Sequence, residues 1–287
     1  MKDYILHHEW KIIEDGFNPE LNRFSESIFS IGNGRMGQRA NFEEKYSGDT
    51  LRGAYIAGIY YPDKTKVGWW KNGYPEYFAK IINSANWIGI NVSINGQVLD
   101  LAKVKIISFR RELNMKKGVL SRNFVAEMAD GDLIEVRALR FLSLDDARIG
   151  AIRYSVKLLN SSAEVTFSPY IDGDVVNEDS NYDEKFWTGI SNENNGSRGY
   201  LLLETLKTGF QVFSGQSFRI LKNKKILLPF ISHFSSEKYI ESSVSVTAGK
   251  NETIIIEKIS SVLTSLDFKP DELILFCYQS VSDAEKT

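Results

Sequence analysis

The sequence predicts an all-β protein, an antiparallel sandwich or barrel with a helix at its C-terminal end. Apolar and polar residues alternate with a period of two over several stretches. This is the pattern of strands that have one buried and one wet face. Turn signals rich in glycine and asparagine separate the stretches. Since no amphipathic helices intervene, antiparallel sheets are favoured over βαβ units.

The first clear strand covers residues 87–94, in which every second residue from 88 onward is isoleucine or valine. Asn95-Gly96 follows it and suits a type I′ hairpin turn, because both residues tolerate a positive φ. Further strands are expected, in chain order, over residues 133–144, 152–158, 244–247 and 253–257.

Two segments interrupt this rhythm. Residues 62–85 hold glycines, prolines and five large aromatic residues, and residues 173–198 are rich in asparagine and acids. Connections of this length without regular structure are uncommon in compact domains, and they tend to be functional or disordered. The aromatic content of the first segment argues against disorder there.

The C-terminal end changes character. Pro270-Asp-Glu-Leu273 has the form of a helix start, with a proline in the first turn and acids near the positive end of the helix dipole. The chain stops at Thr287, about four turns later. An amphipathic helix at a chain end needs a surface to pack on, so we expect the natural protein to continue beyond this residue.

Bulk properties exclude several classes of protein. The formal net charge of −2 provides no basic field for nucleic acid or an anionic membrane. No apolar run approaches the ~20 residues that span a bilayer, and the acids near the N-terminus do not suit a signal peptide. The single cysteine excludes an internal disulfide. We therefore expect a cytoplasmic protein with neither nucleic-acid nor membrane partners.

Gly32-Asn-Gly-Arg-Met-Gly37 has the spacing of a dinucleotide-binding loop, which requires a strand before it and a helix after it. Residues 26–31 suit a strand, but the residues after Gly37 contain no good helix. The favoured alternative is a tight strand connection, in which glycine supplies a positive φ or a close backbone approach.

Candidate catalytic groups are scarce in this sequence. Three histidines at unsuitable spacings support neither a metal site nor a serine triad. Acids are plentiful over residues 172–184, and glycoside chemistry uses carboxylic acids. Such a run is more typical of a solvated loop, so we expect no catalytic residue and no metal ligand in this chain.

Trp69, Trp70, Tyr74 and Phe78 are the most suggestive residues. Sugar rings present apolar C–H faces that stack on aromatic side chains, so this group suits a carbohydrate surface. Large aromatics also pin long loops onto a core. Both interpretations stay open from residue type alone.

Several segments together resemble the disaccharide phosphorylases of glycoside hydrolase family 65. They are residues 26–39 (Glu26-Ser-Ile-Phe-Ser-Ile-Gly-Asn-Gly-Arg-Met-Gly-Gln-Arg39), 55–60, 86–88, 111–122 and 170–177. Residues 62–78 resemble the maltose phosphorylases in particular. The resemblance covers essentially the whole chain, and several motifs in the right order are far more specific than any one of them.

The resemblance implies a large antiparallel super-sandwich of two sheets over residues 1–268. The start of a helical linker over residues 269–287 would follow, and then an (α/α)6 barrel that this chain lacks. The family cleaves α-linked disaccharides with inorganic phosphate as co-substrate and inverts the anomeric centre. Maltose would give glucose and β-glucose 1-phosphate. A glutamic acid of the barrel acts as general acid, so no cofactor is implied here. The implied partners are that downstream barrel, the disaccharide and a second copy in a homodimer.

In this family, sandwich loops help to shape the sugar pocket of the barrel. The resemblance therefore suggests six substrate-binding residues: Trp69, Trp70, Tyr74, Phe78, Asp172 and Trp187. The choice among maltose, trehalose, kojibiose and nigerose stays open, because barrel loops largely set it. Two other functions also stay open, namely a stand-alone carbohydrate-binding sandwich and a dimerisation or interaction module.

Overall fold

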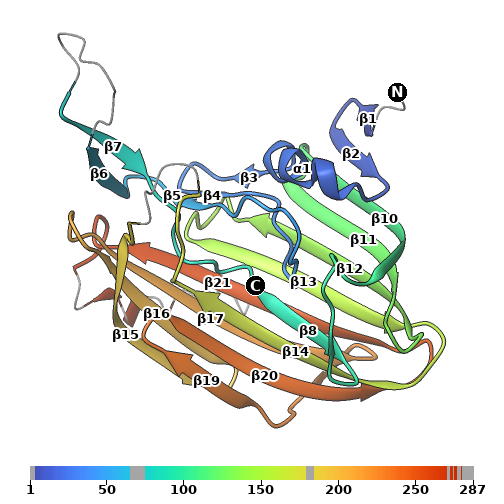
Figure 1. The fold of residues 1–287 in the computed structure, drawn as a ribbon. Coiled ribbons are helices and arrows are strands. Elements are labelled where there is room, and N and C mark those ends of the chain that lie inside the picture. Colours follow the sequence, from blue (N-terminus) through green and yellow to red (C-terminus); the bar gives the residue numbers. More distant parts are fainter. Residues whose placement is uncertain are drawn as a thin grey trace.

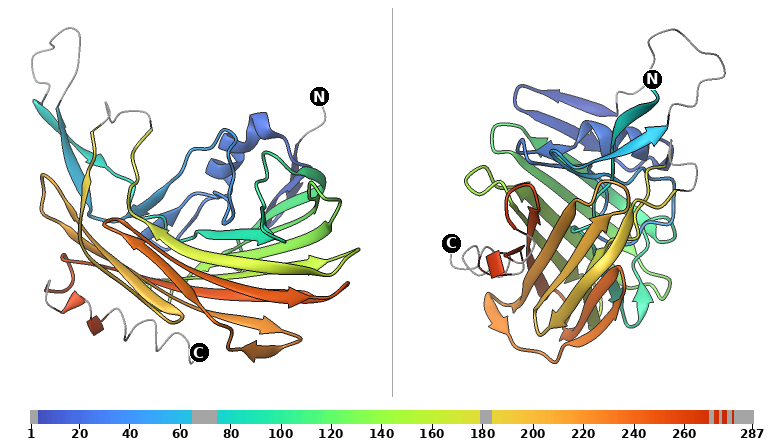
Figure 2. Two further views of the ribbon diagram at one scale, coloured as in Figure 1. Left: turned by 60° about the horizontal axis from the view of Figure 1, so that its bottom comes forward. Right: turned by 90° about the vertical axis from the view of Figure 1, so that its left-hand side faces the viewer.

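The computed structural model describes residues 4–64, 75–178 and 184–269, together with residues 272, 273, 275, 276 and 279. Two large antiparallel sheets lie one over the other (Figure 1, Figure 2). This confirms the predicted all-β sandwich. No helix formed by the described residues has the length and apolar character that a membrane span requires.

The larger sheet has eleven strands in the described chain. Their order is β1-β2-β10-β11-β12-β13-β21-β17-β16-β15, and β18 pairs with β17. The bounds are β1 Ile5–His8, β2 Lys11–Asp15, β10 Lys105–Asn114, β11 Val119–Glu127, β12 Leu133–Leu142, β13 Ile149–Leu158, β15 Trp187–Asn195, β16 Arg198–Thr205, β17 Gln211–Lys222, β18 Lys225–Leu227 and β21 Thr253–Thr264.

The second sheet has the order β19-β20-β14-β8-β9. Its strands are β8 Ile90–Ile94, β9 Gln97–Val98, β14 Ala163–Asp172, β19 Ser232–Ser236 and β20 Tyr239–Ala248. Two small sheets complete the fold, formed by β3 Ile31–Gly32, β4 Met36–Gln38 and β5 Ala54–Ile56, and by β6 Tyr60–Lys64 and β7 Tyr77–Ile81. The helical elements near the N-terminus are the short 3₁₀ turn η1 Pro19–Leu21 and the helix α1 Asn22–Ile28.

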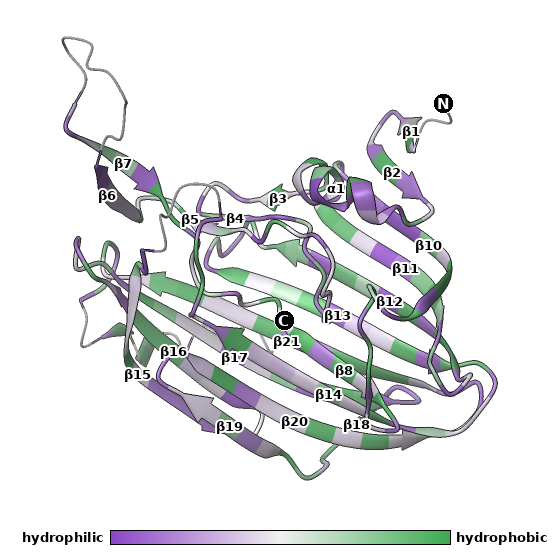
Figure 3. Cartoon of the chain, in the orientation of Figure 1, coloured by the Kyte–Doolittle hydropathy of each residue, from purple (hydrophilic) through white to green (hydrophobic). Residues whose placement is uncertain are grey.

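Alternating residues build the core between the two sheets. Figure 3 shows hydrophobic and hydrophilic positions alternating along the long strands. Val136 and Tyr154 of the larger sheet and Val92 and Phe167 of the second sheet are almost completely buried. The rings of Tyr154 and Phe167 meet edge to face with centroids 6.4 Å apart. Burying each of these large apolar side chains contributes roughly 1.5–3 kcal/mol to stability.

The predicted turn at Asn95-Gly96 is confirmed, because φ is 48° at Asn95 and 78° at Gly96. The predicted strands at residues 133–144, 152–158, 244–247 and 253–257 lie on β12, β13, β20 and β21. The strand predicted over residues 87–94 begins at Ile90, the first residue of β8.

The glycine motif at residues 32–37 is a strand connection, as the favoured alternative proposed. It joins β3 to β4, and Gly34 has a φ of 87°. Asn33 Oδ1 accepts hydrogen bonds from the backbone inside the turn, and Asn33 Nδ2 donates to the carbonyls of Ser143 (2.7 Å) and Ala147 (2.9 Å). The motif therefore anchors a hairpin onto the larger sheet.

The structure corrects the strand predicted over residues 26–31, because α1 covers residues 22–28. Glu26 lies on the buried side of this helix and is fully shielded from solvent. Its carboxylate accepts hydrogen bonds from Asn22 Nδ2 (3.0 Å) and from the backbone N–H of Leu51 (2.7 Å). These tertiary contacts suit a helical backbone and are invisible to local propensity.

Both segments expected to be irregular contain strands. Residues 62–85 include most of β6 and all of β7, which pair as a hairpin projecting from one end of the sandwich (Figure 2). Residues 173–198 include β15, an edge strand paired with β16. The asparagine and glutamate content of β15 lowers its intrinsic strand propensity, but pairing with the apolar β16 overrides it.

A helix does begin at the C-terminal end. Leu273, Leu275, Phe276 and Gln279 have helical backbone, and the Phe276 N–H donates to the carbonyl of Glu272 (3.1 Å). Leu273 is fully buried in a small apolar cluster on the larger sheet, formed with Tyr200, Leu202, Phe213 and Leu263. The surface that this helix requires is therefore supplied in part by the sandwich itself.

Three arginines on neighbouring strands point into the larger sheet's inner face. Arg111 of β10, Arg122 of β11 and Arg140 of β12 are at most 6% exposed. Burying a charge costs several kcal/mol unless a counter-charge and hydrogen bonds accompany it. The sheet would therefore be unstable without anions placed over these three positions.

Residues 39–53, the cover segment, bring two of those anions. Glu43 contacts Arg122 at 2.7 Å and Arg140 at 3.0 Å, and Glu44 makes a second ion pair with Arg122. The ring of Phe42 in the same segment lies 4.6 Å from the Arg122 guanidinium carbon and 5.0 Å from that of Arg111. Cation–π contact adds to the Coulombic attraction.

The third arginine is paired within the sheet. Arg111 Nε lies 3.3 Å from a carboxylate oxygen of Glu14 on β2, and Arg111 also donates to Asn22 Oδ1 (2.9 Å). Burial lowers the pKa of Arg111 to about 10, with the attraction of Glu14 opposing that shift. The guanidinium therefore stays charged at neutral pH.

Replacing Arg122 with methionine should lower the free energy of unfolding by about 3–5 kcal/mol, because the charges of Glu43 and Glu44 would stay buried without their main partner. Urea unfolding followed by tryptophan fluorescence measures the change. Arg137→Met is the matched control, since Arg137 lies on the outer face and its side chain is 66% exposed. That variant should change stability by less than about 0.5 kcal/mol. Equal effects would contradict the role given to the buried cluster.

The cluster also predicts a pH dependence. Burial alone would raise the pKa of Glu43, but the charges of Arg140 and Arg122 outweigh it and hold this pKa below the ordinary 4.5. A lowered folded-state pKa gives stability that is complete above pH 4.5 and disappears as the pH falls through the lowered value. The stability gap between wild type and Glu43→Gln should therefore narrow in acid. A gap independent of pH would refute this assignment.

Candidate functional site

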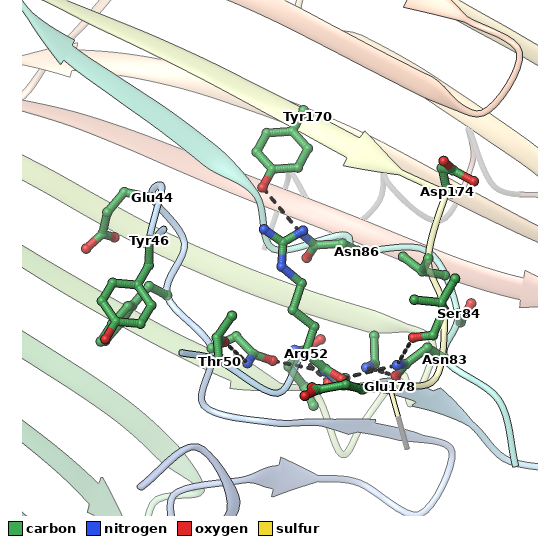
Figure 4. Close-up of a pocket in the computed structure, with 17 residues that line it drawn as sticks. Glu44, Tyr46, Thr50, Arg52, Asn83, Ser84, Asn86, Tyr170, Asp174 and Glu178 are labelled. Atoms are coloured by element: carbon green, nitrogen blue, oxygen red, sulfur yellow. Dashed lines mark hydrogen bonds between the residues drawn. The ribbon is translucent and has the colours of Figure 1, made fainter. Parts of the chain in front are cut away.

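A cavity of about 260 Å³ lies where the cover segment meets the end of β14 (Figure 4). Its lining comes from three parts of the chain that are far apart in sequence: residues 38–54, residues 83–86 and residues 170–178. We call it the Arg52 cavity, because the Arg52 side chain extends across it toward Tyr170 and Asn86 (Figure 4).

Asn83 holds the three walls together. Its side-chain Nδ2 donates to the carbonyls of Arg52 (3.1 Å) and Val176 (2.8 Å), and its Oδ1 accepts from the N–H of Ala54 (3.2 Å). Its own backbone N–H donates to Asn177 Oδ1 (2.8 Å). Asn83 thus fixes the end of the cover segment against the segment that follows β14, so the cavity has a rigid frame.

The far wall is the end of β14. The backbones of Asn86 and Asp172 exchange hydrogen bonds of 2.7 and 3.2 Å, and Asn86 Nδ2 donates to the Tyr170 hydroxyl (3.3 Å). A Cβ on Gly89 would lie 2.2 Å from the Tyr170 ring, so the absence of a side chain there makes room for it. Burial raises the pKa of Tyr170, which keeps its hydroxyl protonated.

Each of the three carboxylates in the lining already has a cationic partner. Glu44 pairs with Arg122, and Glu178 lies 2.9 Å from Arg23. Asp174 contacts Lys185 at 3.0 Å and Lys238 at 3.1 Å, and hydrogen bonds from these two ammonium groups hold its pKa below the ordinary value. Asp174 is therefore an ionised hydrogen-bond acceptor at neutral pH.

Arg52 is different, because it is exposed and makes no ion pair with any residue that the structure describes. Gln38 and Ser84 also line the cavity and are 3% and 4% exposed. Gln38 Oε1 and Ser84 Oγ have no hydrogen-bond partner among the described residues. Among the described residues, the cavity thus combines a cation without an ion-pair partner, two buried oxygens without a hydrogen-bond partner, and three carboxylates.

The structure describes three of the six residues predicted from sequence, namely Phe78, Asp172 and Trp187. Trp69, Trp70 and Tyr74 lie outside the described residues. Phe78 is 46% exposed on the β6–β7 hairpin. Asp172 ends β14 directly behind the cavity, and burial raises its pKa.

Trp187 is 3% exposed, and its indole N–H donates to the carbonyl of Asn83 (2.7 Å). It supports the frame of the cavity from within the core and presents no ring face to solvent. A contact between sugar and any of these six residues stays a prediction.

The cavity residues were missed because they carry no periodic or compositional signal. Gln38, Asn86 and Tyr170 nevertheless lie within segments that resemble the phosphorylase family, namely residues 26–39, 86–88 and 170–177. The Arg52 cavity lies where these three segments meet in space.

The geometry suits binding better than catalysis. A general acid for glycoside cleavage needs a raised pKa and access to the substrate, whereas Asp174 has a lowered pKa and Asp172, with its raised pKa, does not line the cavity. No group of three potential metal ligands occurs among the described histidines, cysteines and acids.

The chain is similar in sequence to several disaccharide phosphorylases. The chain is 40% identical to maltose phosphorylase of Bacillus subtilis (strain 168) over 275 residues, which cover 96% of this chain and 36% of that protein. It is 29% identical to α,α-trehalose phosphorylase and 28% identical to kojibiose phosphorylase, both of Thermoanaerobacter brockii. These matches cover 96% and 94% of this chain, and 37% and 34% of those proteins. The chain therefore spans about a third of the length of these relatives.

A solved structure titled "Putative kojibiose phosphorylase from human microbiome" superimposes with a TM-score of 0.86 at 23% identity, over 99% of this chain and 36% of that one. At this identity the match shows the fold. Residues 12–287 match the family described as "Glycosyl hydrolase family 65, N-terminal domain". With the sandwich, the motif order and the sequence identity in agreement, the chain belongs to the N-terminal domain family of glycosyl hydrolase family 65.

Proposed function

We propose that this chain is the N-terminal domain of an inverting disaccharide phosphorylase whose substrate is maltose. The observation that carries the proposal is the 40% identity to a maltose phosphorylase over 96% of the chain. Identity to the trehalose and kojibiose enzymes is lower, at 29% and 28% over similar lengths. The preference for maltose rests on this difference.

The reaction is a displacement at the anomeric carbon. An oxygen of inorganic phosphate forms a bond to C1 of the non-reducing glucose as the glycosidic C–O bond breaks. The leaving oxygen receives a proton from a carboxylic acid, which gives free glucose and, by inversion, β-glucose 1-phosphate. We assign the acid to a downstream barrel, a proposal supported by the pairing of Glu44, Asp174 and Glu178 with cations in this chain.

The domain itself acts as a scaffold in this proposal. Residues 1–268 form the sandwich, and residues 269–287 lead into a helical linker toward that barrel. The β6–β7 hairpin extends away from the sandwich body (Figure 2) and would help to shape the sugar site. It bears Phe78, and in the sequence Trp69, Trp70 and Tyr74 come between its two strands. A homodimer and a cytoplasmic location stay predictions from the family resemblance.

The longer protein should release glucose and β-glucose 1-phosphate from maltose and phosphate, and the 287-residue chain should release neither. ¹H NMR of the reaction mixture identifies the anomer, and enzymatic detection of glucose 1-phosphate gives the rate. Parallel reactions with trehalose, kojibiose and nigerose measure the substrate preference.

Sugar phosphate from the 287-residue chain alone would refute the location of the general acid. A longer protein that acts on none of these disaccharides would refute the proposed activity. A preference for kojibiose or trehalose would refute only the choice of substrate.

A further inference from the structure

The Arg52 cavity contains features that the fold alone does not require. Buried polar atoms are almost always hydrogen-bonded, and each unsatisfied one costs about 1–3 kcal/mol. Gln38 Oε1 and Ser84 Oγ are two such atoms in the wall of one cavity. Arg52 beside them is the lining cation that pairs with no described carboxylate. An arrangement that is costly for folding is explained if it serves a ligand.

We propose that the Arg52 cavity binds one neutral hexose unit, with glucose as the expected ligand. The polyhydroxyl class follows from the geometry, and the choice of glucose rests on the proposed function.

The chemistry of the lining matches a sugar because hydroxyl groups both donate and accept hydrogen bonds. Gln38 Oε1 and the carboxylate oxygens of Asp174 and Glu178 are acceptors. Arg52 carries five N–H donors, and the Ser84 hydroxyl can do either. The aromatic side chains of Phe42, Tyr46 and Tyr170 supply apolar surface in the same cavity, as the C–H faces of a pyranose require.

The charges argue against an anionic ligand. Arg52 alone would favour a phosphate, but Glu44, Asp174 and Glu178 line the same space. The cationic partners of these three carboxylates balance their charges. A phosphate would therefore meet one cation, Arg52, that has no ion-pair partner among the described residues, and several acceptor oxygens that face the same space. A neutral ligand avoids that repulsion.

The size of the cavity limits the ligand to one ring. Its volume of about 260 Å³ lies just below the ~300–1,000 Å³ of pockets that enclose drug-sized ligands. A monosaccharide, or the terminal unit of a longer sugar, fits this range. Asn83 fixes the frame on three sides, so the pocket is formed before the ligand arrives.

Titrating D-glucose into the 287-residue chain, followed by isothermal calorimetry and ¹⁵N NMR, tests the proposal. We expect saturable binding with shifts confined to residues around the cavity. Ser84→Ala should weaken binding about three- to tenfold, because it removes one neutral hydrogen bond, and Arg52→Met should weaken it at least about tenfold. Inorganic phosphate should not bind there.

Ser84→Ala separates a ligand role from a structural role. A hydroxyl without a partner contributes nothing favourable to folding, so its removal should leave the melting temperature unchanged or raise it. Ser161→Ala is the matched control, since Ser161 Oγ is also unpartnered among the described residues and lies outside the cavity. It should leave glucose binding unchanged.

Absence of saturable glucose binding, binding that survives both cavity variants, or saturable binding of phosphate at these residues would each overturn the proposal. The phosphorolysis assay on the longer protein is independent of this titration. Glucose binding by the 287-residue chain, combined with no phosphorolysis by the longer protein, would refute the proposed function and leave the site standing. Phosphorolysis by the longer protein, combined with no glucose binding by the 287-residue chain, would refute the site alone.

Discussion

The fold depends on compensating the positive charge that its larger sheet buries. Arg111, Arg122 and Arg140 point inward from three consecutive strands. Neither sheet pairing nor the hydrophobic effect can offset three unpaired buried charges, because each costs several kcal/mol. The counter-charges for Arg122 and Arg140 come from Glu43 and Glu44, on a segment without regular structure. The path of that segment is therefore set by electrostatics as much as by packing.

The functional site follows from this constraint. Fixing Glu43 and Glu44 over the sheet also fixes the residues just after them, and these carry Thr50 and Arg52 to the end of β14. Asn83 then ties that stretch to residues 176–177, while Trp187 supports Asn83 from the core. The cavity is a consequence of how the cover segment is held, and its rigidity comes from buried polar contacts.

The pairing of carboxylates with cations also explains why the domain suits recognition better than bond cleavage. Lys185 and Lys238 lower the pKa of Asp174, which makes it a good acceptor and a poor proton donor. Glu44 and Glu178 are paired with arginines.

The sequence by itself determined the features that depend on neighbours along the chain. Alternation at residues 152–158 and 253–257 required strands, Asn95-Gly96 required a tight turn, and Pro270 marked a helix start, because each depends on local backbone preference. Only the tertiary structure decided the helix at residues 22–28 and the polar edge strand β15. It also decided the meeting of Gln38, Arg52 and Ser84 around one cavity. These depend on contacts between distant segments, and a buried charge or an unpaired oxygen leaves no periodic trace in a sequence.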